Sequence, residues 1–147
     1  PFVEALVQHG ASVNVQDPWG WTPLQTAASE AHSELCKHLL SHPAIKVDKK
    51  NKEGYTALMY YAKGSNPSAI RTKQQERTMK EIIHLMLSRG ADVNAKNRYA
   101  ETPLMIAALQ GCEKPAQYLL EKTAVDVNAT NLNGDTALHY AVRTGKK

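Results

Sequence analysis

The chain has 147 residues, 42% of them hydrophobic, and a formal net charge of +4. That length and composition suit one elongated domain, and since no apolar run is long enough to cross a membrane we expect no membrane partner. Cys36 and Cys112 are the two cysteines, too few for a disulfide framework, which favours an intracellular setting, cytoplasmic or nuclear. The basic residues are scattered along the chain rather than massed, so nucleic acid is an unlikely partner.

A short pattern recurs four times along the chain. It begins at Thr22, Thr56, Thr102 and Thr136, which lie 34, 46 and 34 residues apart, and each Thr is followed by Pro or Ala and then Leu. A period in this range is typical of stacked repeats. The sequence therefore predicts an all-α solenoid of helix-turn-helix units rather than an enzyme fold.

The threonines mark where the first helix of each unit begins. A Thr hydroxyl can accept a hydrogen bond from a free N–H of the first helical turn, and Pro23 and Pro103 stand at the first helical position, where a missing N–H costs nothing. Thr22 and Gln25 have the spacing of a capping box. We therefore expect a short helix to start after each of these threonines.

A second helix follows in each unit. Its apolar residues recur at helical spacing, and they are Leu35, Cys36, Leu39 and Leu40, then Ile82, Ile83, Leu85, Met86 and Leu87, then Ala116, Leu119 and Leu120. Small alanines on the first helices allow close approach of the neighbouring helix. No unit could bury its apolar face alone, so stability must come from stacking.

A glycine stands two residues before the Thr in three of the four units, at Gly20, Gly54 and Gly134, and marks a tight turn. The third unit has Ala100 there. If this turn needs a positive φ, the side chain costs about 1 to 2 kcal/mol. The sequence therefore predicts a reshaped third turn.

The unit that begins near residue 51 is longer than the others by about a dozen residues, which fall within Gly64 to Thr78. This stretch is rich in Gly, Ser and Pro at its start and charged at its end. We interpret it as an inserted loop that extends the second helix backward. One reading makes it an extra contact arm with Arg71, Lys73 and Arg77 as its basic edge, and the other makes it a tolerated surface insertion.

Several segments resemble the ankyrin repeat, namely Gly-Ala-Asp-Val-Asn at 90–94, Asp-Pro-Trp-Gly-Trp-Thr-Pro-Leu at 17–24 and Asn-Leu-Asn-Gly-Asp-Thr-Ala-Leu-His at 131–139. The resemblance divides the chain into a partial repeat at 1–16, repeats at 17–50, 51–96 (insertion about 64–78) and 97–130, and a partial repeat at 131–147. It implies an excerpt of a longer ankyrin-repeat solenoid with short hairpin-like turns.

The resemblance also implies a function, because ankyrin repeats grip partner proteins on a concave face lined by turn tips and first helices. The positions of this sequence that match are Trp19, Trp21, Glu30, Lys52, Glu53, Tyr55, Lys63, Arg98, Tyr99, Glu101, Leu109, Gln110, Leu132, Asp135 and Arg143. Trp, Tyr and Arg often dominate binding energy in protein interfaces. We expect a non-catalytic module that binds another protein or a peptide.

Trp21 and Tyr55 have a second interpretation, in which they merely pack along neighbouring turns. Tyr61 is expected in the core and Tyr60 on the concave face.

Two alternative functions stay open. Trp19, Trp21 and Tyr55, with Glu53 or Glu30, could form an aromatic cage for methyl-lysine. The net positive charge and the basic insertion could instead serve a nucleotide-binding or RNA-binding ankyrin domain.

A search for chemistry finds little. The sequence has no phosphate-binding Gly loop and no nucleophile motif, so these residues predict no enzyme and no cofactor. Cys36, His38 and His42 have a metal-like spacing, but structural zinc usually takes four ligands and Cys36 falls on the core side of its helix. We therefore expect no metal.

Overall fold

The computed structural model describes residues 2–64 and 72–145. Within these residues the secondary structure is entirely helical, which confirms the all-α prediction. The helices are α1 (Phe2–Gln8), α2 (Pro23–Ser29), α3 (Ser33–Ser41), α4 (Ala57–Lys63), α5 (Lys73–Ser88), α6 (Pro103–Gln110), α7 (Glu113–Lys122) and α8 (Ala137–Thr144).

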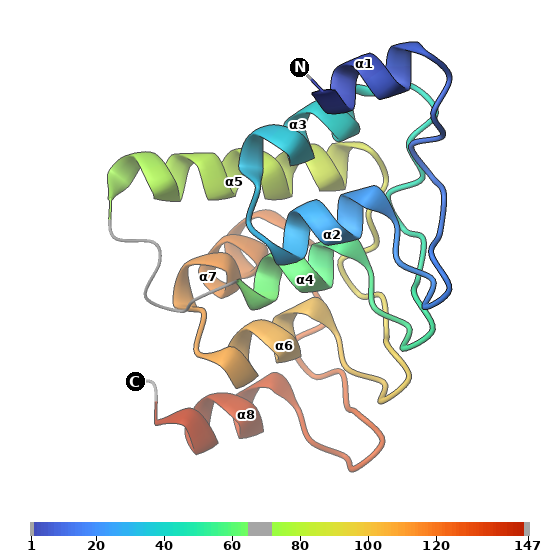
Figure 1. Cartoon of the computed structure of the whole chain (residues 1–147). Coiled ribbons are helices and arrows are strands. Elements are labelled where there is room, and N and C mark those ends of the chain that lie inside the picture. Colours follow the sequence, from blue (N-terminus) through green and yellow to red (C-terminus); the bar gives the residue numbers. More distant parts are fainter. Residues whose placement is uncertain (1, 65–71, 146–147) are drawn as a thin grey trace.

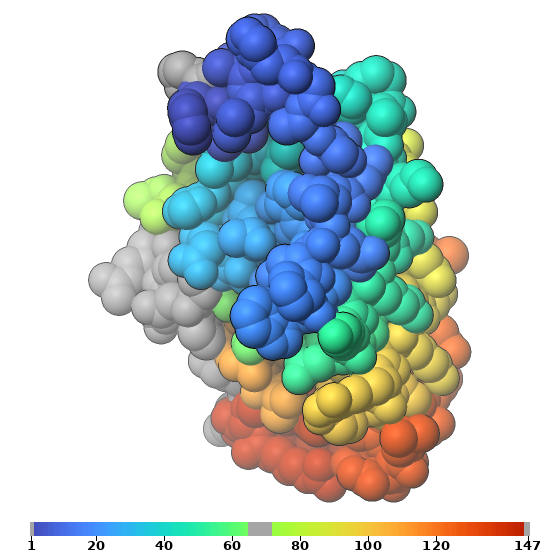
Figure 2. Space-filling view, turned by 45° about the vertical axis from the view of Figure 1, so that its right-hand side comes forward, coloured from blue at the N-terminus to red at the C-terminus, as the bar shows by residue number. Residues whose placement is uncertain are grey.

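The helices form two layers (Figure 1). The inner helices α2, α4, α6 and α8 stack on one another in chain order, and the outer helices α3, α5 and α7 pack behind them. Helix α1 lies at the N-terminal end, where Val3 and Val7 pack against the core. The connections before the inner helices project to one side as a column of turns. Figure 2 shows the units following one another along the stack from the N-terminus to the C-terminus.

The inner helices begin as the sequence predicts. The Thr22 hydroxyl accepts from the Gln25 N–H at 3.2 Å and the Gln25 side chain accepts from the Thr22 N–H at 2.9 Å, so the predicted capping box is confirmed. The Thr56 and Thr102 hydroxyls accept in the same way, at 3.4 and 3.3 Å. Local capping chemistry thus sets the first residue of these helices.

The core runs between the two layers. Leu24, Leu58 and Leu104 of the inner helices are buried, as are Ala27, Ala62 and Ala107. From the outer helices come Leu39, Leu40, Ile82, Ile83, Met86 and Leu119. Leu35 and Leu120 were expected on the same apolar face and are exposed instead, because at about 100° per residue each lies at the edge of the buried stripe of its helix.

The third turn is not reshaped, so the expectation for Ala100 was wrong. Ala100 has φ +60°, and its N–H donates to the Asn97 carbonyl at 3.0 Å, as the Gly20 N–H donates to Asp17 at 2.9 Å. The alanine adopts the left-handed conformation because the bonds of the turn and of its neighbours hold it there. The folded protein therefore retains the conformational cost of a positive φ at this alanine.

The insertion is partly helical. Helix α5 begins at Lys73, capped by Thr72, whose hydroxyl accepts from the Gln75 N–H at 3.1 Å. The expected backward extension of the second helix is therefore present from Lys73 onward. The Glu76 carboxylate contacts Lys80 at 2.7 Å and Lys114 of α7 at 3.3 Å, which ties the extension to the next unit. Residues 65–71, including Arg71, lie outside the described residues.

Candidate binding face

Each turn is fixed by the side chain of its first residue. The Asn51 Oδ1 atom accepts from the N–H of Glu53 at 3.1 Å and of Tyr55 at 2.9 Å. Asp17, Asn97 and Asn131 do the same in the other turns. Because these bonds are internal, the turns keep their shape without a partner.

Hydrogen bonds also join successive turns into a ladder. The N–H groups of Lys52, Arg98 and Leu132 donate to the carbonyls of Trp19, Glu53 and Tyr99 at 3.0, 3.0 and 3.1 Å, respectively. Pro18 occupies the corresponding position of the first turn and has no N–H to donate. The turns at 17–21, 51–55, 97–101 and 131–135 therefore form one rigid array that begins at Pro18.

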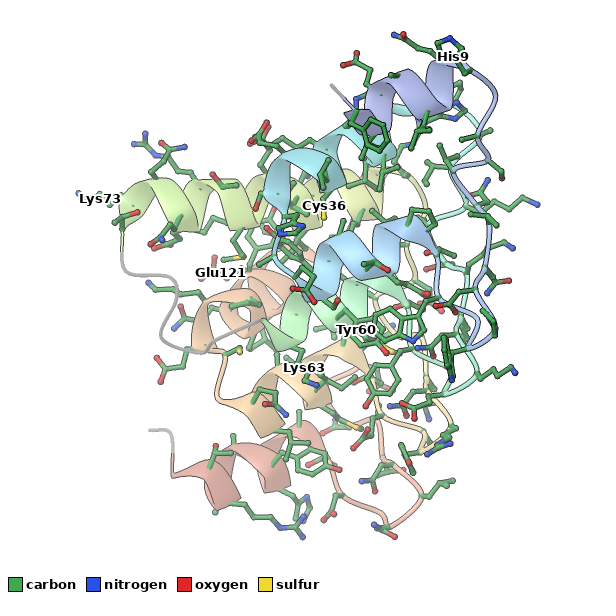
Figure 3. All side chains as sticks on the ribbon, viewed as in Figure 1. His9, Cys36, Tyr60, Lys63, Lys73 and Glu121 are labelled. Atoms are coloured by element: carbon green, nitrogen blue, oxygen red, sulfur yellow. The ribbon has the colours of Figure 1, made fainter. Side chains whose placement is uncertain are left out.

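Three aromatic rings form a stack at the first two turns, which we call the aromatic block (Trp21, Tyr55 and Tyr60). The Tyr60 ring lies 4.4 Å from the Trp21 ring and 5.1 Å from the Tyr55 ring, between centroids, and is tilted by less than 30° from each. The Tyr60 hydroxyl accepts from Asn51 Nδ2 at 2.7 Å, and burial raises the pKa of Tyr60. Figure 3 shows Tyr60 where α4 meets the column of turns.

The structure corrects the expectation for Tyr60 and confirms the one for Tyr61. Tyr60 is only 8% exposed, so it supports the face from below instead of rising onto it, and Tyr61 is buried as expected. Trp21 and Tyr55 are half-buried. They pack along neighbouring turns, as their second interpretation held.

The third and fourth turns carry a different arrangement, which we call the polar cluster (Asn97, Glu101, Asn131 and Tyr140). The Glu101 carboxylate accepts from Asn97 Nδ2 and from the Tyr140 hydroxyl, both at 2.8 Å. Asn131 Nδ2 donates to the same hydroxyl at 2.8 Å. Burial and then Glu101 raise the pKa of Tyr140. Glu101 is 8% exposed, so it was wrongly expected as an exposed contact residue.

The two arginines of the expected site are engaged within the protein. Arg143 holds Asp135 through two hydrogen bonds of 2.9 Å, and this guanidinium lowers the pKa of Asp135. Arg98 donates to the Tyr99 hydroxyl, lies 4.8 Å from the Tyr99 ring centroid and is 3.8 Å from the Glu53 carboxylate. Both arginine side chains remain more than half exposed.

Large apolar side chains at the turn tips are exposed. Trp19 is 67% exposed, Tyr99 44% and Leu132 74%, and Leu109 of α6 is also exposed. Lys52 is exposed at the second turn. Away from the turns, the C-terminal ends of the inner helices carry Glu30, Lys63, Leu109 and Gln110. The structure thus brings the turn residues together and leaves these four at the far edge of the face.

Sequence reasoning missed the supporting role of Tyr60 and Tyr140. Both stand four residues after a capping Thr and both hydroxyls accept from the Asn that opens their own turn. The sequence feature that could have predicted this role is an Asn followed nine residues later by a Tyr, which occurs in both units.

Within residues 2–64 and 72–145, no group of three His, Cys, Asp or Glu side chains is arranged to hold a metal ion. Cys36 is wholly buried, and burial raises the pKa of its thiol to about 12. None of the helices described here combines the length and apolarity needed to cross a membrane.

The fold and the turn ladder define a stacked-repeat protein built from helix-turn-helix units. The chain belongs to the ankyrin-repeat family, since the family model described as ankyrin repeats (3 copies) matches residues 1–72 and 74–147. The resemblance inferred from the sequence is confirmed. Ankyrin repeats are generally non-catalytic protein–protein interaction modules.

Curated relatives agree with this assignment. "Ankyrin repeat, SAM and basic leucine zipper domain-containing protein 1" is 36% identical in Pongo abelii and 39% identical in Loxodonta africana, in each case over 110 residues, which are 75% of this chain and 21% of the relative. Alpha-latrotoxin-Lh1a of Latrodectus hasselti is 32% identical over 140 residues, 94% of this chain and 9% of the toxin. The chain spans about a fifth or less of the length of these relatives.

Proposed function

We propose that this chain binds a partner protein or peptide on the face made by its turn tips and inner helices. The observation that carries the proposal is the exposure of Trp19, Tyr99 and Leu132 on the turn ladder. Exposed apolar area forgoes about 25 cal/mol per Å² that burial would contribute. Such groups clustered along one face mark an interaction site.

The rigidity of the ladder supports the same function. The turns are held by side-chain bonds within each turn and by backbone bonds between turns. A partner therefore meets side chains that are already in place, and little ordering entropy is lost on binding. Trp and Tyr are also the residue types enriched among binding hot spots.

The aromatic cage for methyl-lysine is the weaker candidate. A cage needs open ring faces around a cation, and Tyr60 already stacks on both Trp21 and Tyr55. The position that the ammonium would take between these two rings is filled by a side chain of the protein.

Nucleotide or RNA binding is weaker still. Arg98 and Arg143 are the guanidiniums of the face, and each lies against a carboxylate of the protein, Glu53 and Asp135. A phosphate would have to compete with these acids. A reducing, intracellular setting is part of the proposal, because the chain has only two cysteines, Cys36 and Cys112, and both are buried.

The test compares partner capture by three proteins. Wild type and the face variant Trp19→Ala/Arg98→Ala are compared with Leu120→Ala/Lys122→Ala, which removes one exposed apolar residue and one cation from the outer helix α7. All three must first show equal circular dichroism and urea midpoints. We expect the face variant to lose partners that the outer-helix variant keeps. Equal capture by wild type and the face variant would remove the turn tips from the proposal.

A further inference from the structure

The second and third turns each carry a pair of exposed cations. Asn51 and Asn97 are buried, because their side chains hold their own turns from within. The residues on either side of each asparagine are exposed, and all of them are basic. In the chain the two pairs stand far apart, but in the fold they lie on neighbouring turns of one column (Figure 1). We call this surface the cationic patch (Lys50, Lys52, Lys96 and Arg98).

Contacts between the two turns bring the pairs close together. The Lys50 Nζ atom donates to the Lys96 carbonyl at 2.8 Å, although the two residues are 46 positions apart. The Arg98 N–H donates to the Glu53 carbonyl at 3.0 Å, and a Cβ added to Gly54 would lie 2.8 Å from the Arg98 backbone nitrogen. A carbonyl carries no net charge, so Lys50 keeps its positive charge beside Lys96. An anionic ligand would therefore meet several cations at once.

Most carboxylates of the same two connections are engaged elsewhere. Glu101 is buried and accepts from Asn97 Nδ2 and the Tyr140 hydroxyl. Asp48 accepts from the Asp92 N–H at 3.0 and 3.1 Å, and Asp92 accepts from the N–H two residues further on at 2.8 Å. These acids hold the backbone of the protein and do not cover the exposed cations.

Glu53 is the acid that stands among the cations at the turn tips. It lies 3.8 Å from Arg98, and both side chains are more than half exposed, so this ion pair is weak. Within the described part of the chain, no carboxylate forms an ion pair with Lys52 or Lys96. The cationic patch thus retains a positive charge that an acidic ligand can match.

We propose that the cationic patch binds a short acidic segment of the partner, with the carboxylates opposite the second and third turns and apolar residues on either side. The inference rests on the proposed binding function. It adds the chemistry of the partner segment and the turns that receive its charged part.

The first and fourth turns set the two ends of the segment. The Trp19 carbonyl accepts from the Lys52 N–H, and the Tyr99 carbonyl accepts from the Leu132 N–H. Trp19 and Leu132 are 67% and 74% exposed, so both neighbouring turns offer apolar area. Packed helices lie about 8–10 Å apart, which puts the first and fourth turns about 24–30 Å from each other. An extended peptide of about eight residues spans that length.

A nucleic acid suits this order of turns less well than a peptide does. Every nucleotide carries a phosphate, so a strand that crosses the cationic patch also places phosphates at the first and fourth turns. There it meets the carboxylate of Asp17 and the apolar Trp19 on one side and the apolar Leu132 on the other. A peptide can confine its acids to the two central turns.

The first part of the test uses octaglutamate as the probe and a Gly-Ser peptide of the same length as the uncharged control. In a ¹H–¹⁵N titration at about 50 mM NaCl, octaglutamate should shift the amide signals of residues 50–54 and 96–100 saturably. At about 500 mM NaCl the binding should weaken about tenfold or more, because the ion pairs are screened. The Gly-Ser peptide should produce no saturable shift at either salt concentration.

The second part compares two variants with the same loss of charge. Lys52→Gln/Arg98→Gln changes the cationic patch, and Lys114→Gln/Lys122→Gln changes two exposed lysines of α7. The first should weaken octaglutamate binding about tenfold, which corresponds to roughly 1.4 kcal/mol, and the second by less than about twofold. Circular dichroism checks that both fold as wild type does. If the patch variant does not fold, Lys52→Gln alone replaces it, with an expected loss of about threefold.

Several outcomes would overturn the inference. They are the absence of saturable octaglutamate shifts, shifts confined to residues outside the turns, and equal weakening in the two double variants. Tighter binding of an eight-nucleotide oligo-dT than of octaglutamate at the same salt concentration would assign the cationic patch to nucleic acid instead. Any of these results leaves the proposed function standing if the face variant still loses partners in the capture experiment.

Discussion

Each half of the candidate face is held together by one buried tyrosine, but the contacts of that tyrosine differ between the halves. Each half joins two turns to an inner helix through a tyrosine whose hydroxyl accepts from the first Asn of its turn. In the first half the ring of Tyr60 stacks on Trp21 and Tyr55, and in the second half the hydroxyl of Tyr140 donates to Glu101. The comparison shows that the same ladder of turns can be supported by stacked rings or by a buried polar network, depending on a few side chains.

The largest difference between the halves should appear when the central ring is removed. Tyr60→Ala deletes a buried ring and should lower the free energy of unfolding by about 3 to 5 kcal/mol. Tyr60→Phe loses only the bond from Asn51 and should cost about 1 kcal/mol. Urea denaturation measures both, with the exposed Tyr99→Ala as a control expected within about 0.5 kcal/mol of wild type. Equal costs for Ala and Phe would mean that the hydroxyl, not the stack, holds the first half together.

The polar cluster should respond most to loss of its carboxylate. Glu101→Ala leaves Asn97 Nδ2 without its acceptor and the Tyr140 hydroxyl without the carboxylate, and should cost about 2 kcal/mol. Glu53→Ala is the matched control, since Glu53 stands in a neighbouring turn but forms only an exposed pair, worth about 0 to 1 kcal/mol. A urea series on the two variants checks the difference. Equal costs would show that the polar cluster adds nothing to the second half.

The turns themselves offer a smaller test of the comparison. Ala100→Gly relieves a positive φ in the third turn and should raise the free energy of unfolding by about 0.5 to 1 kcal/mol, after the entropy that glycine adds to the unfolded chain. Gly54→Ala should do the opposite, since a Cβ there would lie 2.8 Å from the Arg98 backbone nitrogen. Thermal unfolding of both variants checks the opposite signs. A loss of stability in Ala100→Gly would contradict the view that this turn stores strain.

The smallest expected effect is on the stability of α8 at acid pH. The Arg143 guanidinium lowers the folded-state pKa of Asp135 below 3.8, so this contribution to stability is present above pH 3.8 and is lost as the pH falls through the folded pKa. Hydrogen exchange of the backbone amides in α8 should therefore speed up below pH 3.8. The indole N–H signals of the two tryptophans in the first half should stay unchanged in an NMR spectrum over the same pH range. Arg143→Gln should remove this pH dependence. Identical acid profiles for variant and wild type would assign the effect to another carboxyl group.

Local patterns predicted the framework of the molecule well. The capping hydroxyls of Thr22, Thr56 and Thr102 are confirmed, as are the prolines at the first helical position and the buried alanines of α2, α4 and α6. Thr136 precedes α8 as expected, but its hydroxyl lies against the His139 ring instead of a backbone N–H. These features depend on residues within one helical turn of each other, so a short stretch of sequence contains the information. Ala100 shows the limit of this reasoning, because bonds to neighbouring turns hold a conformation that the residue alone disfavours.

The candidate site was predicted less well. The exposure of Trp19 and Leu132 follows from their place at turn tips. Glu101 has the same place in its turn as Trp21 and Tyr55 do in theirs, yet it is buried by a tyrosine that lies 39 residues further along the chain. No local pattern distinguishes that glutamate from an exposed one.

Repetition and capping were enough to predict the family, the all-α solenoid and the threonines before the inner helices, because these are short-range properties of the chain. Packing between units decides which side chains of the face are exposed and which support it. Trp21 meets Tyr60, and Glu101 meets Tyr140, only when one unit stacks on the next. The contacts that shape the face lie between repeats, so they come into existence only with the packing of the whole stack.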